Sequence, residues 1–123
     1  MTRFRFLSLV SLACLGILTA YCGQPASGAP AANDGAALKQ AIDKGALIVD
    51  VRTAEEYAGG HYANAVNIPV DQVESRLSEF GGDKNRTIVV YCRSGNRSGM
   101  AQRILQQNGF AHVLNGINQA HMP

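Results

Sequence analysis

Apolar and polar residues follow a helical period in some stretches of the chain and form strand-like runs in others, and the first helical stretch begins near residue 34. Asp34 can cap this helix and Gly45 can end it, because each residue type is favoured at that helix end. A mostly apolar run at 46–51 follows, which predicts a strand buried on both faces of a sheet. The apolar residues on the inner face of the predicted helix are Ala37, Leu38, Ala41 and Ile42.

Capping patterns predict two further helices. Thr53 and Glu56 form a capping box, which predicts a short helix directly after the first strand. The run 65–68 predicts a second strand, and Asp71 with Glu74 then forms another box-like helix start. The inner face of this later helix is expected to hold Val73, Leu77 and Phe80.

The last third of the chain continues the alternation of strands and helices. Segment 87–91 is β-branched and aromatic, which is typical of a strand, and a polar loop at 92–97 follows it. A helix is expected from about 98 to 107, then a short strand at 112–114 and a turn at 115–116. The order predicts an α/β fold of three layers, a mainly parallel sheet with helices on both faces. The inward residues of the last helix are expected to be Met100, Ile104 and Leu105.

The first 33 residues differ in composition from the rest. Arg3 and Arg5 precede an uncharged, mostly apolar run of thirteen residues at 6–18, an order typical of a secretory signal peptide. The run is shorter than the about 20 residues that a membrane-spanning helix needs. We therefore predict a signal peptide at 1–22, a flexible Gly/Ala/Pro-rich linker at 23–33 and a folded domain at 34–123, in preference to a buried helix of a cytosolic protein.

The sequence leaves the cleavage point open. Segments 18–20 and 26–28 each end in small residues and are compatible with release of a soluble exported product. Cys22 offers a second outcome, because bacterial lipoproteins are cut before a cysteine that receives lipid, although the bulky Tyr21 fits that signal poorly. Contact with a membrane is expected only if Cys22 is lipidated.

Removal of the predicted signal changes the charge and the cysteine content. The chain has 11 Lys and Arg against 9 Asp and Glu, and loss of Arg3 and Arg5 leaves 9 of each. A neutral domain has no basic footprint, so we predict no nucleic-acid partner. Of the three cysteines, Cys92 alone lies in the predicted domain. It has no partner there for an internal disulfide, and it is either an inert buried thiol or a reactive one.

Cys92 lies where the clearest predicted strand gives way to a loop and a helix. Ligands of open α/β sheets bind at this carboxyl edge, and the start of a helix adds about half a positive charge. Arg93 and Arg97 add two full charges, and Gly95 permits backbone conformations that other residues avoid. These effects favour the thiolate, so the pKa of Cys92 is expected below the ~8.5 of free cysteine. Attack on a sulfane sulfur or a phosphoryl group is the chemistry that such a thiolate suits.

Two separate motifs resemble those of rhodanese-family sulfurtransferases. Segment 92–98, Cys-Arg-Ser-Gly-Asn-Arg-Ser, looks like the active-site loop of that family. The end of the chain at 115–123 is similar to small periplasmic rhodaneses of the phage-shock type, which implies a bacterial periplasmic location. Asn64 departs from the family, which usually has glycine there. The second motif comprises 49–52, 55–57, 60–61 and 65–69.

The resemblance implies a rhodanese-like fold and sulfur transfer through Cys92 as the catalytic residue. The thiolate would take the outer sulfur of a small anionic donor such as thiosulfate, and cyanide or a thiol would then collect that sulfur from the Cys92 persulfide. No metal and no organic cofactor is implied, and we expect a monomer. The resemblance assigns substrate binding to the loop residues Arg93, Ser94, Gly95, Asn96, Arg97 and Ser98.

Asp50 and Arg52 lie at the end of another predicted strand, and two interpretations are open. They either border the same pocket or form a structural hydrogen-bonded pair, and we favour the pair. His61 is expected to have an architectural role. His112 and His121 do not show zinc-ligand spacing with Cys92, so we predict no metal site.

Three functional alternatives accompany the leading hypothesis. A persulfide carrier or redox-responsive thiol domain would relay sulfur, or oxidise, with little thiosulfate turnover. A cysteine-dependent phosphatase is disfavoured, because four residues separate Cys92 from Arg97, one fewer than in the loop of those enzymes. A non-catalytic interaction module is disfavoured because such modules tend to lack the nucleophile.

Overall fold

The structure, a computed structural model, describes residues 34–123. These are the residues of the predicted folded domain, whereas the predicted signal peptide at 1–22 and the linker at 23–33 lie outside the described residues and stay predictions. Within the described part, none of the helices combines the length and the apolar character that crossing a membrane requires.

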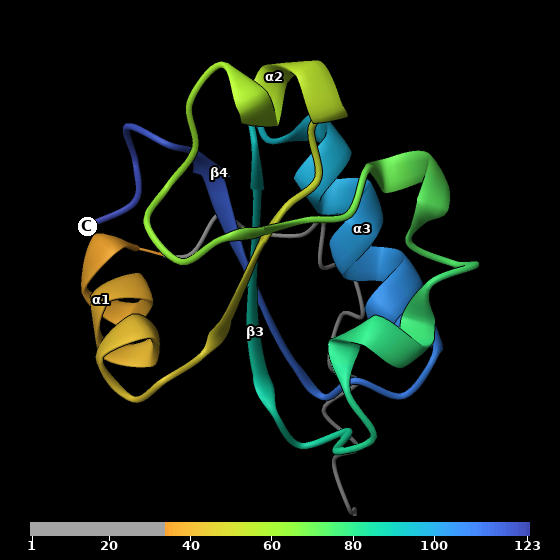
Figure 1. Ribbon diagram of the computed structural model, residues 1–123. Coiled ribbons are helices and arrows are strands. Elements are labelled where there is room, and N and C mark those ends of the chain that lie inside the picture. Colours follow the sequence, from red (N-terminus) through yellow and green to blue (C-terminus); the bar gives the residue numbers. More distant parts are fainter. Residues whose placement is uncertain (1–33) are drawn as a thin grey trace, which may run out of the picture.

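A parallel sheet forms the middle layer of the domain (Figure 1). Its four strands lie in the order β2-β1-β3-β4, and each neighbouring pair is parallel. The predicted α/β fold is therefore confirmed. The strands are β1 (Leu47–Asp50), β2 (Val66–Asn67), β3 (Thr87–Cys92) and β4 (His112–Asn118).

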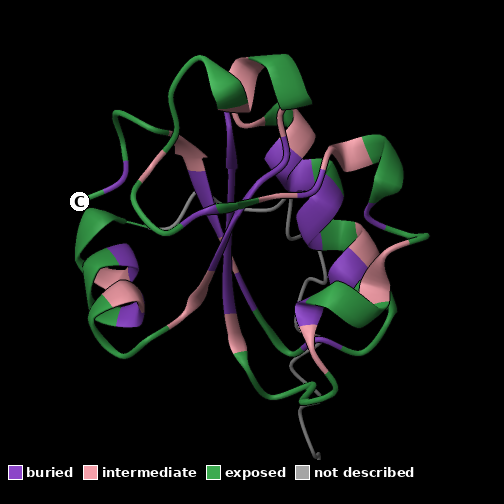
Figure 2. Cartoon of the chain, viewed as in Figure 1, coloured by how far each residue is buried: buried purple, intermediate pink, exposed green. Residues whose placement is uncertain are grey.

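Helices cover both faces of this sheet, so the three predicted layers are present (Figure 1). Helix α1 (Gly35–Asp43) packs on one face, and α3 (Asn96–Gln107) packs on the other. The short helix α2 (Ala54–Ala58) follows the carboxyl end of β1 and lies above the end of β3. Figure 2 shows that the buried residues concentrate along the strands and the inner faces of α1 and α3.

The core has two parts, one on each side of the sheet. Leu38 of α1 packs with Ile48, Val89 and Tyr91 on the first side. Because side chains alternate along a strand, Cys92 points to the other side, where it belongs to the cluster of α3. The alternation along β3 thus places the candidate nucleophile beside the start of α3.

The two predicted caps of the first half are confirmed. The Asp34 carboxylate accepts a hydrogen bond of 2.7 Å from the amide of Ala37, as expected of a helix N-cap. Thr53 and Glu56 form the reciprocal capping box, because each side chain accepts a hydrogen bond from the backbone amide of the other.

The predicted helix beginning at Asp71 is wrong. Two short 3-10 turns occupy the segment, η1 (Val70–Gln72) and η2 (Leu77–Phe80), and neither has a side-chain cap. Val73 and Phe80 are nevertheless fully buried, as expected. A spacing of three residues places side chains on one side of a 3-10 turn as well as of an α-helix, so the apolar pattern did not distinguish the two.

Helix α3 begins at Asn96, two residues before the predicted start, and Met100 does not face inward. The Met100 side chain is 52% exposed, whereas Leu105 is buried as predicted. The inner face of α3 is built from small and polar residues, which an apolar pattern does not detect. Its buried residues are Ser98, Gly99, Ala101, Gln102 and Leu105.

The predicted turn at 115–116 is also wrong, because β4 continues through it to Asn118. The pairing of β3 with β4 shifts between Val90 and Cys92, which marks a bulge in β4. Ile117 has a φ of +61° in this bulge, a conformation that β-branched residues rarely adopt. The bulge brings the end of β4 beside the loop that follows Cys92.

Candidate functional site

The thiol of Cys92 lies at the carboxyl end of β3 and is almost completely buried. Its Sγ accepts a hydrogen bond of 3.1 Å from the backbone amide of Gly95. The hydroxyl oxygen of Ser98, in the first turn of α3, lies 3.4 Å from the same sulfur. The loop therefore folds back over Cys92 and directs a backbone donor at its sulfur.

Gly95 makes this tight turn possible. Its φ is +91°, in the left-handed region that favours glycine. A Cβ at this position would also lie 3.2 Å from Cγ2 of Ile117, which is closer than ordinary van der Waals contact. The bulge of β4 and the loop after β3 thus fit together only with glycine here.

Opposing effects set the pKa of Cys92. Burial of the thiol by itself raises the pKa, whereas hydrogen bonds from the Ser98 side chain and from loop amides lower it, and the net result is a pKa below the ordinary value. The amides belong to Ser98, Gly95 and Ser94. Stabilisation of the thiolate therefore comes from short-range donors of the loop, which the loop sequence predicted in part.

A pocket of about 260 Å³ opens beside the sulfur. It combines the cations of Arg52 and Arg93 with the carboxamides of Asn118 and Gln119, so its lining suits a small anion. Another pocket, of about 360 Å³, lies between α1 and the start of β4, and Cys92 does not line it. The sequence did not indicate Asn118, Gln119 and Ala120 as lining residues, because they follow the bulge of β4 that looked like a turn.

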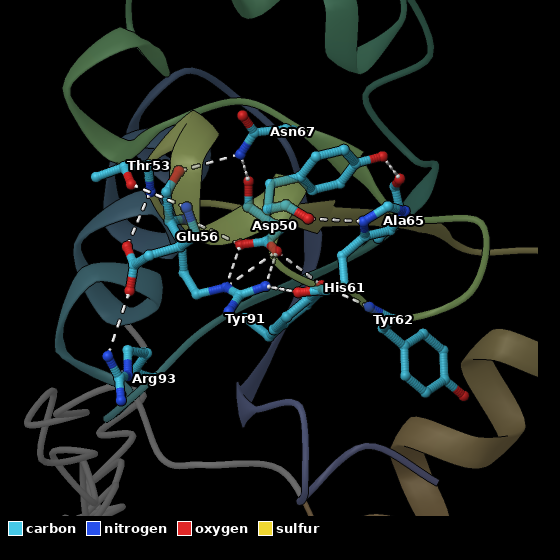
Figure 3. A network of polar contacts seen from close by, with 12 residues as sticks. Asp50, Thr53, Glu56, His61, Tyr62, Ala65, Asn67, Tyr91 and Arg93 are labelled. Carbon is cyan, nitrogen blue, oxygen red and sulfur yellow. Dashed lines mark hydrogen bonds and ion pairs between the residues drawn. The ribbon is translucent and has the colours of Figure 1, made fainter.

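Glu56 of α2 neutralises one of the two loop arginines. Arg97 donates two hydrogen bonds to its carboxylate, of 2.7 and 3.1 Å. Arg93 lies 3.9 Å from the same carboxylate, as Figure 3 shows, and its side chain is 75% exposed. In the sequence, Glu56 belongs to a capping box and to the rhodanese-like motif at 55–57, and neither signal indicates an ion pair with Arg97. Of the two loop arginines, Arg93 is therefore the one that is exposed mainly to solvent and to the pocket.

The Glu56 carboxylate gives the domain a pH-dependent stability. The Arg97 guanidinium and the Thr53 amide lower the pKa of Glu56 to about 2. Because the pKa is lower in the folded state, the stabilisation is present above the unfolded value of about 4.5 and is lost as pH falls toward 2. Glu56→Gln is therefore expected to lower the free energy of unfolding by about 1 kcal/mol at neutral pH and by almost nothing near pH 2.

Urea denaturation at these two pH values measures the effect. The matched control is Glu55→Gln, which changes an exposed carboxylate of the same helix that has no ion pair with Arg97. An equal loss of stability at both pH values in Glu56→Gln would contradict the role of the charge.

Asp50 and Arg52 form a structural hydrogen-bonded pair, and Arg52 also borders the pocket. Asp50 is fully buried and does not line the pocket, and its carboxylate accepts hydrogen bonds of 2.6–3.0 Å from Arg52 and one of 2.8 Å from the Tyr91 hydroxyl (Figure 3). Arg52 also donates to the carbonyl of Gly60 at 2.7 Å and lines the pocket beside Cys92. The pair thus connects the loop after β1 to β3 and presents one cation to the site.

The remaining predicted residues occupy peripheral places. Ser94 is exposed in the loop, and Asn96 is the exposed first residue of α3. The His61 ring stacks on Tyr57 at 3.7 Å between centroids, and its Nδ1 lies 2.9 Å from the Tyr57 carbonyl oxygen, an arrangement that serves packing. Asn64 has a φ of +62°, which explains why this turn accepts asparagine in place of glycine.

Among residues 34–123 no group of three or more His, Cys, Asp and Glu side chains could hold a metal ion.

Comparison with known proteins identifies the family of this chain. The family model of the rhodanese-like domain matches residues 34–118. The thiosulfate sulfurtransferase PspE of Escherichia coli is 42% identical over 77 residues, which cover 61% of this chain and 74% of PspE. The putative sulfur carrier protein YrkF of Bacillus subtilis is 41% identical over 83 residues, which cover 66% of this chain and 44% of YrkF.

A solved structure shows the same fold. The human single-domain sulfurtransferase TSTD1 superimposes with a TM-score of 0.63 at 29% identity, and the match covers 72% of this chain and 88% of TSTD1. The region that the family model matches, residues 34–118, includes the sheet and the loop that surround Cys92 in this chain. The chain therefore belongs to the rhodanese family of sulfurtransferases, and within that family it is similar to PspE.

Proposed function

We propose that this chain moves sulfane sulfur from an anionic donor such as thiosulfate to cyanide or a thiol, through a persulfide on Cys92. The observation that carries the proposal is the sulfur of Cys92 at the edge of a cationic pocket, with the Gly95 amide 3.1 Å away. The name of PspE, a thiosulfate sulfurtransferase, supports thiosulfate as the donor.

The proposed reaction has two steps. The Cys92 thiolate attacks the outer sulfur of thiosulfate, a bond forms between the two sulfurs, and the sulfur–sulfur bond of the donor breaks with its electron pair leaving on sulfite. The terminal sulfur of the new persulfide then carries the negative charge. In the second step the acceptor carbon or sulfur attacks that terminal sulfur, and the Cys92 thiolate is released.

The residues around the sulfur support both steps. The amides of Ser94, Gly95 and Ser98 favour negative charge on Sγ, which supports the proposal that the loop from Arg93 to Ser98 also stabilises charge on the terminal sulfur of the persulfide. Arg93 and Arg52 give the pocket positive charge for the donor anion. Because these donors lower the pKa of Cys92, a larger fraction of it is thiolate at neutral pH, and the attack needs no separate general base.

We expect Arg93 and Arg97 to have different roles. Arg93→Ala should raise the KM for thiosulfate about 3–10-fold and change the free energy of unfolding by less than about 0.5 kcal/mol, because its side chain is exposed. Arg97→Ala should destabilise the domain by about 1 kcal/mol, because Glu56 loses its ion pair. Steady-state kinetics and urea denaturation of both variants test this division, and identical changes in the two variants would contradict it.

Two alternatives predict different outcomes of one experiment. A persulfide carrier, which the similarity to YrkF favours, would accept sulfur without efficient turnover. A cysteine-dependent phosphatase holds phosphate with the arginine at the end of the loop, but here Glu56 engages that arginine, Arg97, with both carboxylate oxygens. The arrangement of Arg97 therefore favours sulfur chemistry.

The test is to incubate the protein with thiosulfate, measure its intact mass, and then add cyanide and follow thiocyanate. The proposal predicts a mass gain of one sulfur atom on the peptide that contains Cys92, followed by catalytic formation of thiocyanate. Sulfur loading without turnover would favour the carrier. Absence of loading, combined with cleavage of an aryl phosphate, would overturn the proposal in favour of a phosphatase.

A further inference from the structure

Asn115 of β4 has a buried carboxamide next to the cysteine loop, and its orientation is fixed by its neighbours. Its Oδ1 accepts a hydrogen bond of 2.9 Å from the amide of Ile117, a group that can only donate. The atom that faces this amide must therefore be the oxygen and not the nitrogen. The bulge of β4 thus aims an obligatory acceptor at the start of α3.

Ser98 lies between this acceptor and the nucleophile. Its Oγ is 2.7 Å from Oδ1 of Asn115 and 3.4 Å from Sγ of Cys92. A serine hydroxyl has one proton, and Oδ1 can only accept, so at 2.7 Å Ser98 donates that proton to Asn115. The hydroxyl then presents lone pairs to the sulfur, which suits a thiol that donates but not a thiolate.

We propose that Asn115 is a positioning residue that holds the Ser98 hydroxyl proton while Cys92 is a thiol or persulfide, and yields it to Sγ when Cys92 is a thiolate. The proposal rests on the proposed function of Cys92 as the nucleophile. Ser98 turns its O–H between two acceptors, so no covalent bond changes and no proton leaves the group.

The turning of Ser98 costs little free energy, because Oδ1 of Asn115 always keeps a hydrogen-bond donor. When Ser98 turns to the sulfur, Oδ1 keeps the hydrogen bond of 2.9 Å from Ile117. Ser98 can also donate to the carbonyl of Gly95 at 3.1 Å, which gives its proton an intermediate position between the two acceptors. A buried polar group that stays satisfied in both states avoids the penalty of an unpaired acceptor.

The turning of Ser98 follows the two half-reactions. In the free thiolate the negative charge is on Sγ, and the Ser98 proton is directed there. After sulfur uptake the charge moves to the terminal sulfur and Sγ becomes neutral, so the proton returns to Asn115. Each transfer of sulfur out of the persulfide reverses the exchange. The Ser98 hydroxyl is thus directed to Sγ only while Sγ carries the negative charge.

The charged side chains around Sγ are exposed or already paired, so none of them takes over the role of the Ser98 hydroxyl. On the loop and α3 sides, Arg93 is exposed and Arg97 is paired with Glu56 of α2. On the β1 side, Arg52 is paired with Asp50. The end of β4 from 113 to 120 contains no ionisable side chain. Asn115 Oδ1, at 2.7 Å from the Ser98 Oγ against 3.1 Å for the Gly95 carbonyl, is therefore the nearest acceptor in competition with Cys92 for the Ser98 proton.

The test uses the full chain and measures the pKa of Cys92 from the pH dependence of its alkylation by iodoacetamide, followed on the Cys92 peptide by mass spectrometry. Asn115→Ala removes the competing acceptor and is expected to lower the pKa of Cys92 by about half a unit. Asn115→Asp has nearly the same shape and binds the proton more strongly, so it is expected to raise the pKa by at least that amount. A change that only loosened the loop would shift both variants in the same direction.

The decisive comparison repeats both Asn115 variants in a chain that also carries Ser98→Ala, because this background lacks the hydroxyl proton that is exchanged. In that background Asn115→Ala is expected to leave the pKa of Cys92 unchanged, and Asn115→Asp is expected to shift it less than in the presence of Ser98. Equal shifts with and without Ser98 would overturn the proposal, and the Asp variant alone decides the matter if the Ala variant does not fold. Alkylation does not require sulfur transfer, so failure of the proposed function would appear separately, in the thiosulfate assay.

Discussion

Replacement of Cys92 by serine is expected to abolish sulfur transfer while the domain stays folded. Serine keeps the shape of the side chain and an acceptor for the Gly95 amide, which lies 3.1 Å from the sulfur in the native chain. A hydroxyl is not ionised at neutral pH and cannot form a persulfide, so thiosulfate turnover should fall to the rate of the reaction without protein. The assay is formation of thiocyanate from thiosulfate and cyanide, and circular dichroism checks the fold.

Cys22→Ser is the matched control for this experiment. Cys22 is one of the three cysteines of the chain and lies outside the predicted domain, so its loss should change neither turnover nor the mass gain on the Cys92 peptide. Transfer that survives Cys92→Ser, or that disappears in Cys22→Ser, would show that another thiol carries the reaction.

Removal of the Asp50 carboxylate is expected to have the largest effect on stability. Asp50→Ala leaves the nearly buried guanidinium of Arg52 and the buried hydroxyl of Tyr91 without their common partner. Loss of one partner of a buried ion pair typically costs about 3–5 kcal/mol, a large part of the roughly 5–15 kcal/mol that stabilises a domain of this size. Urea denaturation at neutral pH measures the loss as a lower midpoint.

Asp43→Ala provides the contrast within the same chain. Asp43 pairs with Lys39 at 2.7 Å, but their side chains are 61% and 64% exposed. Exposed pairs contribute little, so the expected loss is below about 1 kcal/mol. Similar midpoints for the Asp50 and Asp43 variants would show that the buried network does not stabilise the domain as its contacts suggest.

Local signals allowed much of the fold to be predicted. The Asp34 cap, the Thr53 capping box and the β-branched strand at 87–91 each depend on residues within a few positions, and the structure contains all three. The parallel sheet followed from their order along the chain, because strands that alternate with helices pair in parallel. These elements also place Cys92 at the carboxyl edge, where the sequence predicted it.

The errors arose where distant contacts override a local pattern. The Asn-Gly pair at 115–116 has the composition of a turn, yet Gly116 packs within β4 against Tyr91 and Met122, and Asn115 bonds to Ser98. A side chain at 116 would meet the Met122 sulfur at 2.5 Å, so glycine serves close packing here. Nothing near 115 in the sequence shows these partners.

The candidate site was predicted unevenly for the same reason. The loop from Cys92 to Ser98 is continuous in sequence, so its chemistry could be inferred from spacing alone. Glu56 and Asn115 come from α2 and β4, and their contacts with Arg97 and Ser98 depend on the packing of those elements. Glu56 belongs to a capping box and to the rhodanese-like motif at 55–57, and Asn115 belongs to the chain end at 115–123, but none of these local signals indicates the contacts with Arg97 and Ser98.

The bulge of β4 also affects how the outer edge of the sheet meets other chains. In the described part of the chain β4 is paired on one side only, and it is longer than β2 at the opposite edge. An unpaired strand of this length is a template for edge-to-edge aggregation, and bulges interrupt the regular ladder that such pairing needs. The positive φ of Ile117 therefore places a break in that template next to the cysteine loop, so the residues that shape the pocket also interrupt the regular ladder that edge-to-edge pairing would need.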